Sequence, residues 1–447
     1  MRRGWIPPVE PVAAPEDLPP RPPSSRIKVL HVITKFTTGA GGNTLLSATG
    51  MNQSVYDVSI ATSAGGELWE RAERGGVHMI PLRRFRETIS PLNDLFVLWQ
   101  LLRLIRRERF TIVHTHTAKA GFIGRTAAWL CRTPVVVHTI HAFSFHPHMS
   151  RLRHRVYLTL ERLARRATDA FIAVAPRVAL EAVERRVAPP GRVTVVPSAV
   201  DLDEVPHSID APARLDLGVP ADVPLVGTVG RLTHQKAPMD FVRMAAIIAR
   251  SRPEARFVMI GDGPMTDDVR RESDRLGLQI ILPGFRTDAL KIAAGFDVFV
   301  MPSLYEGLGR SLTEALAAGR PVVASAVNGV LDLVVHGATG LLTPSGDPEA
   351  VARSVLWLLD HPAQAEAMGR QGRAVVRDLF DQTEMCRSLD EIYRGLLGLP
   401  PEEPSDHEAQ VIVLPDTQDQ VIVLPDTQEQ MSVLPDTQER RLSSHGR

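Results

Sequence analysis

Short runs of β-branched and other apolar residues alternate with helix-like segments along most of this chain, and that alternation restricts the fold more than any other feature. The runs in the first half of the chain are KVLHVI (28–33), VSIATS (58–63), FTIVHTH (110–116), PVVVHTIH (134–141) and AFIAVA (170–175). Between them, as in 90–110, apolar residues recur at the three- and four-residue spacing of a helix. Strands that alternate with helices predict a parallel sheet with helices on both of its faces.

The same alternation restarts after a Pro- and Asp-rich passage at 201–224. The second set of strand-like runs is PLVGTVG (224–230), RFVMIGDG (256–263), QIILPGF (279–285), VFVMPS (298–303) and PVVASA (321–326). We therefore predict an α/β chain with two doubly wound, Rossmann-like domains, at 26–204 and 223–398, joined by a linker at 205–222. Ligands of open α/β sheets bind at the carboxyl ends of the strands, so we expect a ligand in the cleft between the domains.

The segments outside these domains have a different composition. Residues 1–25 are rich in proline and lack an apolar core of signal-peptide length, and 399–447 contain three ten-residue copies, QVIVLPDTQD, QVIVLPDTQE and QMSVLPDTQE. Both segments are predicted to be disordered, and a repeated docking motif is the alternative for the copies. No run approaches the roughly 20 apolar residues of a membrane span. Only two cysteines occur, both in apolar, helix-like contexts, and we expect a cytoplasmic protein.

The formal net charge is zero, which argues against a nucleic-acid partner, but residues 151–168 are strongly basic. This segment holds six arginines and a single acid, Glu161, and its apolar residues recur near helical spacing. The pattern predicts an amphipathic helix. Its basic face is either an ordinary solvated surface or a surface that binds an anionic membrane, which would make the protein peripheral at the inner membrane face.

The stretch YEGLGRSLTEALAAGRPVVAS (305–325) combines features of an anion site with two carboxylates. Glu306 and Glu314 flank a glycine pair and the predicted start of a helix, about Gly309, where unpaired amides and the helix dipole favour a phosphate. Upstream, GRLTHQK (230–236) places Arg231 and Lys236 on a loop after a strand. Carboxylates accept hydrogen bonds from polyols, so the set predicts a clamp for a sugar–diphosphate–ribose ligand. Each feature alone is also compatible with solvated surface residues.

Histidines form a second group of candidates. His114, His116, His138 and His141 alternate on two strand-like segments. Four such residues could suggest a metal site, but no carboxylate or cysteine completes a ligand set, so we predict none. The acidic pair in Asp201-Leu202-Asp203 lies at the start of the linker rather than after a nucleotide-binding strand, and we do not interpret it as a metal–diphosphate motif.

Five segments carry a family resemblance: GRLTHQKAP, RFVMIGDGP, ILPGFRTD, FDVFVMPSLYEGLGRSLTEALAAGRPVVAS and HGATGLL. With this order and spacing, the chain resembles the family 4 retaining glycosyltransferases from about residue 26 to 397. The resemblance implies a GT-B fold, in which two Rossmann-like domains face a central cleft. It also implies a nucleotide diphosphate sugar as donor, a saccharide or lipid-linked acceptor, no metal or other cofactor, and a part in cell-surface polysaccharide or glycolipid synthesis.

In the second domain, the resemblance implies that Arg231 and Lys236 hold the donor diphosphate and stabilise the leaving group. Glu306 would contact the donor sugar, and Glu314 would bind the ribose. Backbone amides would reach the sugar and phosphate, and two further residues would flank the base; these are Gly307, Leu308 and Gly309, then Phe285 and Arg286.

In the first domain, VVVHTIHAFSF (135–145) would place His141 in the active site, and VHTHTAKAG (113–121) makes His116 an acceptor-side candidate. The loop TTGAGGNT would bring Gly41 and Gly42 to the donor, although it is shorter than the usual form and lacks its acidic residue.

Two further departures from the family pattern concern the second domain. Ala237 and Pro238 follow the lysine where the family often has glycine. Asn328, Gly329 and Asp332 stand where a Gly-Gly pair and a glutamate are more usual.

Three other functions compete with glycosyl transfer. A sugar-nucleotide epimerase of similar architecture would need no acceptor, and a non-catalytic scaffold would not need the Arg231, Lys236, Glu306 and Glu314 set. A dehydrogenase is disfavoured because GAGGNT lacks the full dinucleotide fingerprint and no acidic residue follows at the required distance.

Overall fold

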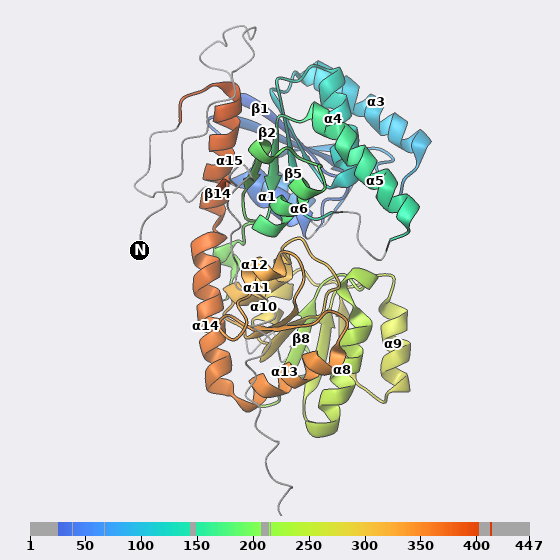
Figure 1. The fold of residues 1–447 in the computed structure, drawn as a ribbon, viewed down its shortest axis with the longest axis vertical. Coiled ribbons are helices and arrows are strands. Elements are labelled where there is room, and N and C mark those ends of the chain that lie inside the picture. Colours follow the sequence, from blue (N-terminus) through green and yellow to red (C-terminus); the bar gives the residue numbers. More distant parts are fainter. Residues whose placement is uncertain are drawn as a thin grey trace, which may run out of the picture.

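The computed structural model of the chain describes residues 26–37, 39–66, 68–143, 149–206, 214, 216–401 and the backbone of 412–413. These residues form two lobes, each built around its own sheet, stacked along the long axis of the molecule (Figure 1). The predicted α/β fold with two Rossmann-like units facing each other is confirmed. The tail predicted at 1–25 lies outside the described residues, as do most of the tail predicted at 399–447 and residues 207–213 and 215 of the linker predicted at 205–222.

The first sheet has the strand order β14-β7-β6-β5-β4-β1-β2-β3, and the strands from β7 to β3 in this order all pair in parallel. They are β1 (Ile27–Val32), β2 (Tyr56–Ser63), β3 (His78–Leu82), β4 (Ile112–His116), β5 (Val135–Ile140), β6 (Ala170–Ala173) and β7 (Val193–Val195). The order reverses between β1 and β4. Doubly wound sheets bind ligands at such a reversal, at the carboxyl ends of the strands.

A short strand lies within the predicted C-terminal tail. β14 (Ile412–Val413) pairs antiparallel with β7, within a segment that we predict to be disordered. The pairing has a physical reason, since an edge strand presents unpaired backbone groups and Ile-Val has high β propensity.

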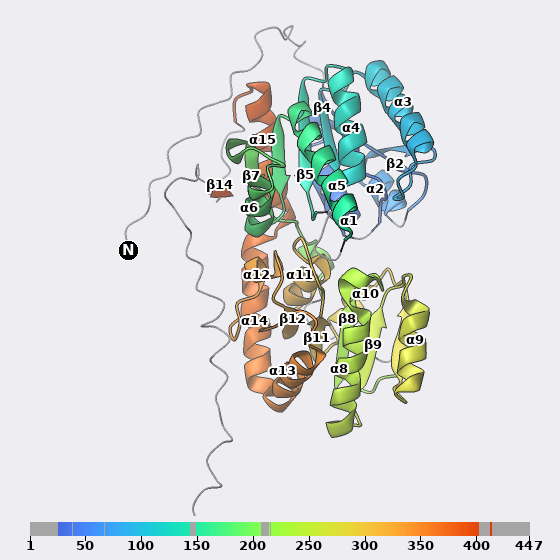
Figure 2. The same cartoon turned by 45° about the vertical axis from the view of Figure 1, so that its right-hand side comes forward.

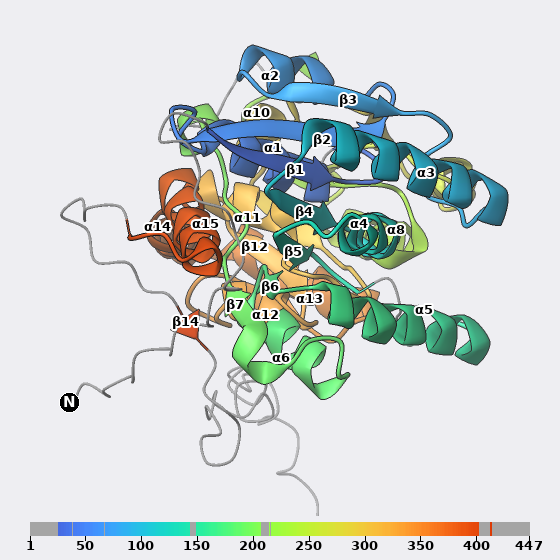
Figure 3. The same cartoon turned by 90° about the horizontal axis from the view of Figure 1, so that it is seen from above.

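Helices cover both faces of the first sheet, as Figure 3 shows from above. Alternate strand residues such as Val29 and Ile112 pack on one face against α1 (Ala40–Gly50), α2 (Trp69–Arg74) and α15 (Gln382–Leu397). The intervening residues pack on the other face against α3 (Pro91–Glu108) and α4 (Ala118–Leu130). The remaining helices of this lobe are α5 (Arg151–Ala164), η1 (Arg165–Ala167), α6 (Pro176–Glu184), η2 (Pro190–Arg192) and η3 (Leu202–Glu204).

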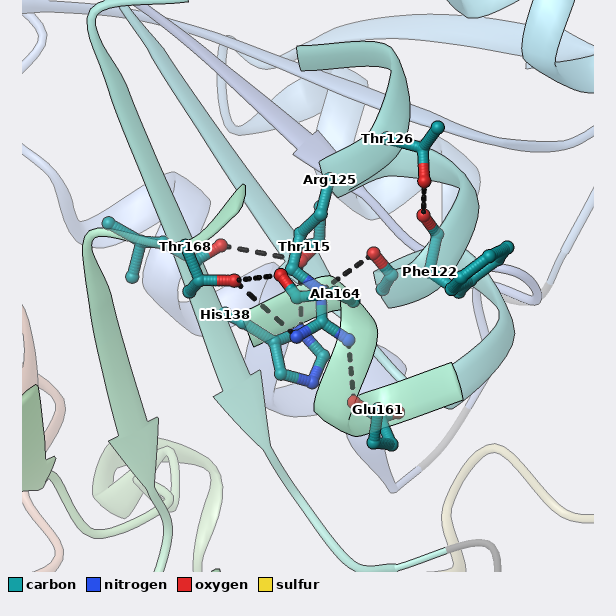
Figure 4. A network of polar contacts seen from close by, with 10 residues as sticks. Thr115, Phe122, Arg125, Thr126, His138, Glu161, Ala164 and Thr168 are labelled. Carbon is teal, nitrogen blue, oxygen red and sulfur yellow. Dashed lines mark hydrogen bonds and ion pairs between the residues drawn. The ribbon is translucent and has the colours of Figure 1, made fainter. Parts of the chain in front are cut away.

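The predicted basic helix exists, and its one acid points inward (Figure 4). Arg125 of α4 is fully buried and donates to Glu161 of α5 at 2.6 Å and to the Gly121 carbonyl at 2.8 Å. Because a buried ion pair is costly to break, this contact fixes the face that α5 turns toward α4. The arginines of α5 are left on the outside.

The second sheet has the order β10-β9-β8-β11-β12-β13, which reverses between β8 and β11. Its strands are β8 (Leu225–Val229), β9 (Arg256–Ile260), β10 (Ile280–Gly284), β11 (Val298–Met301), β12 (Val322–Ser325) and β13 (Leu341–Thr343). Its helices are η4 (His234–Lys236), α8 (Pro238–Ser251), α9 (Thr266–Arg275), α10 (Ala289–Ala293), α11 (Arg310–Ala317), α12 (Val330–Leu333), α13 (Pro348–Asp360) and α14 (Pro362–Leu379).

The chain crosses back to the first lobe after α14. Figure 2 shows α14 beside the second lobe and α15 beside the first, although both belong to the segment that the sequence assigns to the second domain. Tyr56 of β2 donates to Asp390 of α15 at 2.6 Å, and Tyr393 is fully buried against the first sheet. The C-terminal helix therefore fastens the two lobes together. Among the described residues, no helix combines the length and apolar character that crossing a bilayer requires.

Candidate active site

Two loops of the second lobe meet at the reversal of its strand order. Gln235 ties the loop after β8 to the loop after β11, because its carbonyl accepts from the Leu304 amide at 2.8 Å and its side chain donates to the Tyr305 carbonyl at 3.0 Å. This brings two of the predicted site residues into contact: Lys236 Nζ lies 2.5 Å from Glu306 Oε1, and Glu306 is only 8% exposed. The candidate site thus contains a partly buried cation and carboxylate in direct contact.

Arg231 lies on the same loop, nearer to solvent. Its side chain is 54% exposed, and its Nη1 lies 3.7 Å from Glu87 Oε1 of the first lobe. A small cavity lined by Gly230, Arg231, Lys236 and Ser303 lies at the carboxyl ends of β8 and β11. The predicted cations therefore converge on the place where a ligand of this sheet type binds.

The loop departs from the family pattern without loss of the helix that follows it. Ala237 adopts the left-handed φ of 46°, which glycine adopts more readily, and it precedes the first residue of α8. That residue is Pro238, whose missing N–H costs no hydrogen bond in the first turn of a helix. The backbone here is fixed at both ends of the Ala237–Pro238 bond.

The helix begins one residue later than the sequence predicts. α11 begins at Arg310, and Gly309, with φ 89°, precedes it without a side-chain cap. Gly307 lies at the contact between the lobes, where an added β-carbon would overlap the His141 carbonyl oxygen. The loop that carries Glu306 therefore passes so close to the end of β5 in the first lobe that only glycine fits at position 307.

Arg310 is a site residue that the sequence analysis misses. Its Nε donates to Glu314 at 2.8 Å, and its guanidinium lies so close to Gly42 that an added β-carbon there would overlap it. Its Nη1 is buried, and no described residue supplies an acceptor. A signal was available, because a cation in the first turn opposes the helix dipole and is unfavourable unless an anion compensates for it.

The other predicted donor-side residues are placed differently. The Leu308 side chain is buried in the core, so only the backbone of this residue is placed to contact a ligand. Gly41 lies against the backbone of Phe36, one residue before the Gly42 contact. Phe285 and Arg286 follow β10, which β9 separates from β8, so they flank the cluster rather than join it. Arg286 pairs with Asp288 at 2.7 and 2.6 Å.

Residues that depart from the family pattern join the lobes a second time. Asp332 of α12 accepts from the Arg177 amide at 2.9 Å, and the Asn328 side chain donates to Glu181 at 3.0 Å. Both partners belong to α6 of the first lobe. These residues therefore serve the interface between the lobes.

Five histidines on or just after the central strands β1, β4 and β5 lie on two faces of the first sheet. His116 Nε2 lies 2.8 Å from Nδ1 of His31, and His116 Nδ1 lies 3.1 Å from Nε2 of His141. His114, on the same face, contacts the Tyr393 and Thr139 hydroxyls at 2.6 and 2.7 Å. His138 lies on the opposite face, 2.9 Å from the Thr115 hydroxyl.

Burial controls the ionisation of these histidines. It lowers the pKa of His31 to about 3 and that of His141 to about 4, where the charge of Arg310 acts in the same direction. It also holds the pKa of His116 well below its usual range. His116 is fully buried behind His141, so the expected contact with an acceptor is not a direct one. His31 was not predicted from the sequence, although a polar residue within the apolar run KVLHVI is an available signal.

Three of the rings also come close enough for a metal ion to be considered. Nitrogens of His31, His114 and His116 lie within 4.8 Å of one another. However, the rings of His114 and His116 are stacked, with centroids 4.4 Å apart and planes at 29°. Since an imidazole binds a metal in its own plane, two stacked rings do not point at one ion, and both nitrogens of His114 already have partners. This geometry favours hydrogen bonding over metal ligation.

Known proteins match the chain across both lobes. Residues 213–375 match the family described as glycosyl transferases group 1, and residues 38–199 match the glycosyl transferase 4-like domain. The 2-deoxystreptamine N-acetyl-D-glucosaminyltransferase of Streptomyces fradiae is 32% identical over 335 residues, which cover 70% of this chain and 79% of that protein. The chain belongs to the glycosyltransferases.

A second relative and a solved structure are also similar to the chain. The UDP-Gal:alpha-D-GlcNAc-diphosphoundecaprenol alpha-1,3-galactosyltransferase of Escherichia coli is 29% identical over 378 residues, which cover 83% of this glycosyltransferase and 97% of that enzyme. The crystal structure of Anabaena Alr3699/HepE in complex with UDP-glucose has a TM-score of 0.71 at 21% identity. It covers 82% of this chain and 99% of that chain, and it confirms the GT-B fold.

Proposed function

We propose that this glycosyltransferase is a retaining enzyme of family 4, which moves a sugar from a nucleotide diphosphate donor to a hydroxyl of a saccharide or lipid-linked acceptor. The observation that carries the proposal is the Lys236–Glu306 pair, held by two tied loops beside the start of α11. The E. coli relative takes its name from a UDP-sugar and a diphosphoundecaprenol acceptor, and a Staphylococcus aureus relative is named for capsular polysaccharide biosynthesis. These names support a part in cell-surface polysaccharide or glycolipid synthesis.

The geometry suits a diphosphate with a polyol at each end. Lys236 and Arg231 supply positive charge, and the amides at Gly307 to Gly309 supply hydrogen-bond donors at an uncapped helix start. When the diphosphate binds Lys236 in place of Glu306, the Glu306 carboxylate becomes free to accept hydrogen bonds from the sugar hydroxyls. Glu314, a turn further into α11, takes the ribose hydroxyls.

In the reaction, the bond between the anomeric carbon and the diphosphate oxygen breaks while the acceptor oxygen bonds to the same face of that carbon. The acceptor proton passes to the donor phosphate. Negative charge grows on the leaving diphosphate, and fixed cations beside it stabilise the transition state more than the ground state. We assign this stabilisation to Lys236 and Arg231 and propose that no metal is required. His141, against Gly307, closes the sugar end of the site.

Arg310 adds a cation to this proposal. Its unpaired Nη1 lies between α11 and Gly42, so we assign it to the donor diphosphate. Arg310→Met should weaken UDP binding about tenfold and change uridine binding much less, because only the diphosphate carries the charge that a guanidinium fork recognises. Calorimetry with the two ligands measures both values. Equal losses for UDP and uridine would contradict the assignment.

One experiment tests the function as a whole. A panel of nucleotide diphosphate sugars is screened by thermal shift, since a ligand that binds only the folded protein raises its unfolding temperature. Donors that bind are then incubated with undecaprenyl-linked and free saccharide acceptors in EDTA, and the anomeric configuration of the product is read by NMR. An inverted product contradicts retention, activity only with added metal contradicts metal independence, and a donor epimerised without acceptor contradicts transfer.

We further propose that the outer helices of the first lobe bind an anionic membrane. α5 exposes Leu152 (74%) and Val156 (44%) among its arginines. α3 exposes Leu92 (84%) and Trp99 (53%), and Arg103 lies over the Trp99 ring at 5.9 Å. Apolar side chains beside cations suit the headgroup region of an anionic bilayer.

Co-sedimentation with vesicles tests the membrane surface. We expect binding to phosphatidylglycerol vesicles that weakens at high salt, and little binding to phosphatidylcholine vesicles. Leu152→Ser should reduce the binding, whereas Leu379→Ser, an exposed leucine of the second lobe, should not. Equal binding of both variants, or no binding at low salt, would remove this part of the proposal.

A further inference from the structure

Three histidines form a hydrogen-bonded series that runs from the cleft into the first sheet. His31 of β1, His116 at the end of β4 and His141 just after β5 occupy alternate positions that share one face. The nitrogen pairs are Nδ1 of His31 with Nε2 of His116, at 2.8 Å, and Nδ1 of His116 with Nε2 of His141, at 3.1 Å. His31 and His116 are fully buried, and His141 borders the contact with Gly307.

The two hydrogen bonds couple the tautomers of all three rings. Burial keeps the rings neutral near pH 7 by lowering the pKa of each, and a neutral imidazole carries one N–H and one lone pair. Each hydrogen bond needs one N–H, so only two arrangements keep both bonds. In the first, every ring is protonated on Nδ1. In the second, every ring is protonated on Nε2.

The buried end of the series distinguishes the two arrangements. Nε2 of His31 is buried, and it makes no hydrogen bond with any described group. The second arrangement would leave an N–H unpaired there, whereas the first leaves only a lone pair. Buried N–H groups without an acceptor are the rarer defect in proteins. The other end, Nδ1 of His141, takes no part in the series.

We propose that His31 and His116 are positioning residues, which hold His141 as the tautomer protonated on Nδ1. His141 then donates a hydrogen bond through Nδ1 to an oxygen of the donor or acceptor in the cleft. This inference rests on the proposed function for the role of His141, but not for its tautomer. In this proposal, the buried residues His31 and His116 affect the reaction through His141 and do not touch a substrate themselves.

The first test is spectroscopic and needs no substrate. The full-length protein is labelled with nitrogen-15 at histidine, and long-range proton–nitrogen spectra at pH 7 give the protonated nitrogen of each ring. Comparison with His141→Gln assigns the His141 signals. We expect a proton on Nδ1 of His141. A proton on Nε2 would overturn the proposal.

The second test uses two substitutions at His31. An asparagine at this position can place a carboxamide N–H where the Nδ1–H of the histidine lies, so His31→Asn should keep kcat within about threefold of the original. His31→Leu removes the donor and should lower kcat about tenfold or more, because an unfixed tautomer impairs a catalytic histidine. UDP affinity should stay within about twofold in both variants.

Each outcome of these tests decides one question. If His31→Leu transfers sugar as well as His31→Asn does, the positioning role is wrong. If His31→Leu does not fold, as thermal unfolding would show, the nitrogen spectra of the unsubstituted protein still decide the tautomer. If the unsubstituted protein binds no nucleotide sugar, the proposed function fails while the tautomer result stands.

Discussion

Replacing Lys236 by methionine tests the electrostatic core of the proposed reaction. Methionine keeps most of the apolar stem and removes the charge that lies 2.5 Å from Glu306. Loss of one group that stabilises developing charge costs about 10²–10³-fold in kcat. The Lys236 side chain is 25% exposed, and solvent screens part of its field. We therefore expect a loss of about 10²-fold, or about 2.7 kcal/mol of transition-state stabilisation.

The same substitution should also destabilise the folded protein, for a separate reason. Glu306 is 8% exposed and would lose its cation. A buried group left without its partner costs about 1–3 kcal/mol of unfolding free energy. Adding Glu306→Gln removes the unpaired charge, so the double variant should recover stability without recovering turnover. Urea unfolding measures the first quantity, and steady-state kinetics with the donor found by screening measures the second.

Two results would refute this reasoning. Lys236→Met with kcat within threefold of the original would show that this cation does not stabilise the leaving group. Recovery of turnover in the double variant would show that the loss arose from an unpaired Glu306. Lys291→Met, at an exposed lysine of α10, is the matched control and should leave both quantities unchanged.

Three other substitutions or conditions probe the remaining parts of the site. Gly307→Ala should abolish most transfer and spare UDP binding, because a β-carbon there overlaps the His141 carbonyl and holds the lobes apart; small-angle scattering and calorimetry check this. Glu314→Gln should weaken UDP affinity about tenfold while kcat at saturating donor falls less than threefold, because the ribose hydroxyls lose a charged acceptor; the opposite pattern would contradict a ribose-binding role. Unfolding free energy should fall below about pH 6.5, because the unfolded protein then takes up protons at histidines such as His31 and His141, whose folded pKa values burial lowers to about 3 and about 4. The fall is about 1.4 kcal/mol per pH unit for each such histidine until its folded pKa is reached, and urea unfolding at pH 7 and pH 5 measures it.

The parallel sheets, and a common site for Lys236 and Glu306, were within reach of the sequence, because each follows from local rules. Apolar runs separated by helices give parallel strands, and loops after neighbouring strands meet at one edge of the sheet. The position of α15 was not within reach. Its amphipathic pattern shows that one face is buried, but it does not show that Tyr393 is buried against the first lobe rather than the second.

The site residues that were not predicted from the sequence depend on contacts between distant segments. The role of Arg310 depends on its contact with Gly42, in the other lobe. The role of His31 depends on its hydrogen bond with His116, on a strand that follows after about 80 residues. A single sequence carries only indirect signs of such contacts, namely a cation at a helix start and a histidine in an apolar run. Both break a local rule, and sites are where sequences break local rules.

The ion pairs of the cleft suggest why such a site would favour a complete nucleotide sugar. Each cation that we assign to the diphosphate is paired with a carboxylate: Lys236 with Glu306, Arg310 with Glu314, and Arg231 with Glu87. A diphosphate that takes over the first two cations leaves two carboxylates without partners, and one of them is 8% exposed. That loss offsets part of the gain. A sugar and a ribose supply hydroxyl donors to Glu306 and Glu314 at the same time. A ligand with a polyol at each end of its diphosphate therefore replaces the contacts that both carboxylates lose.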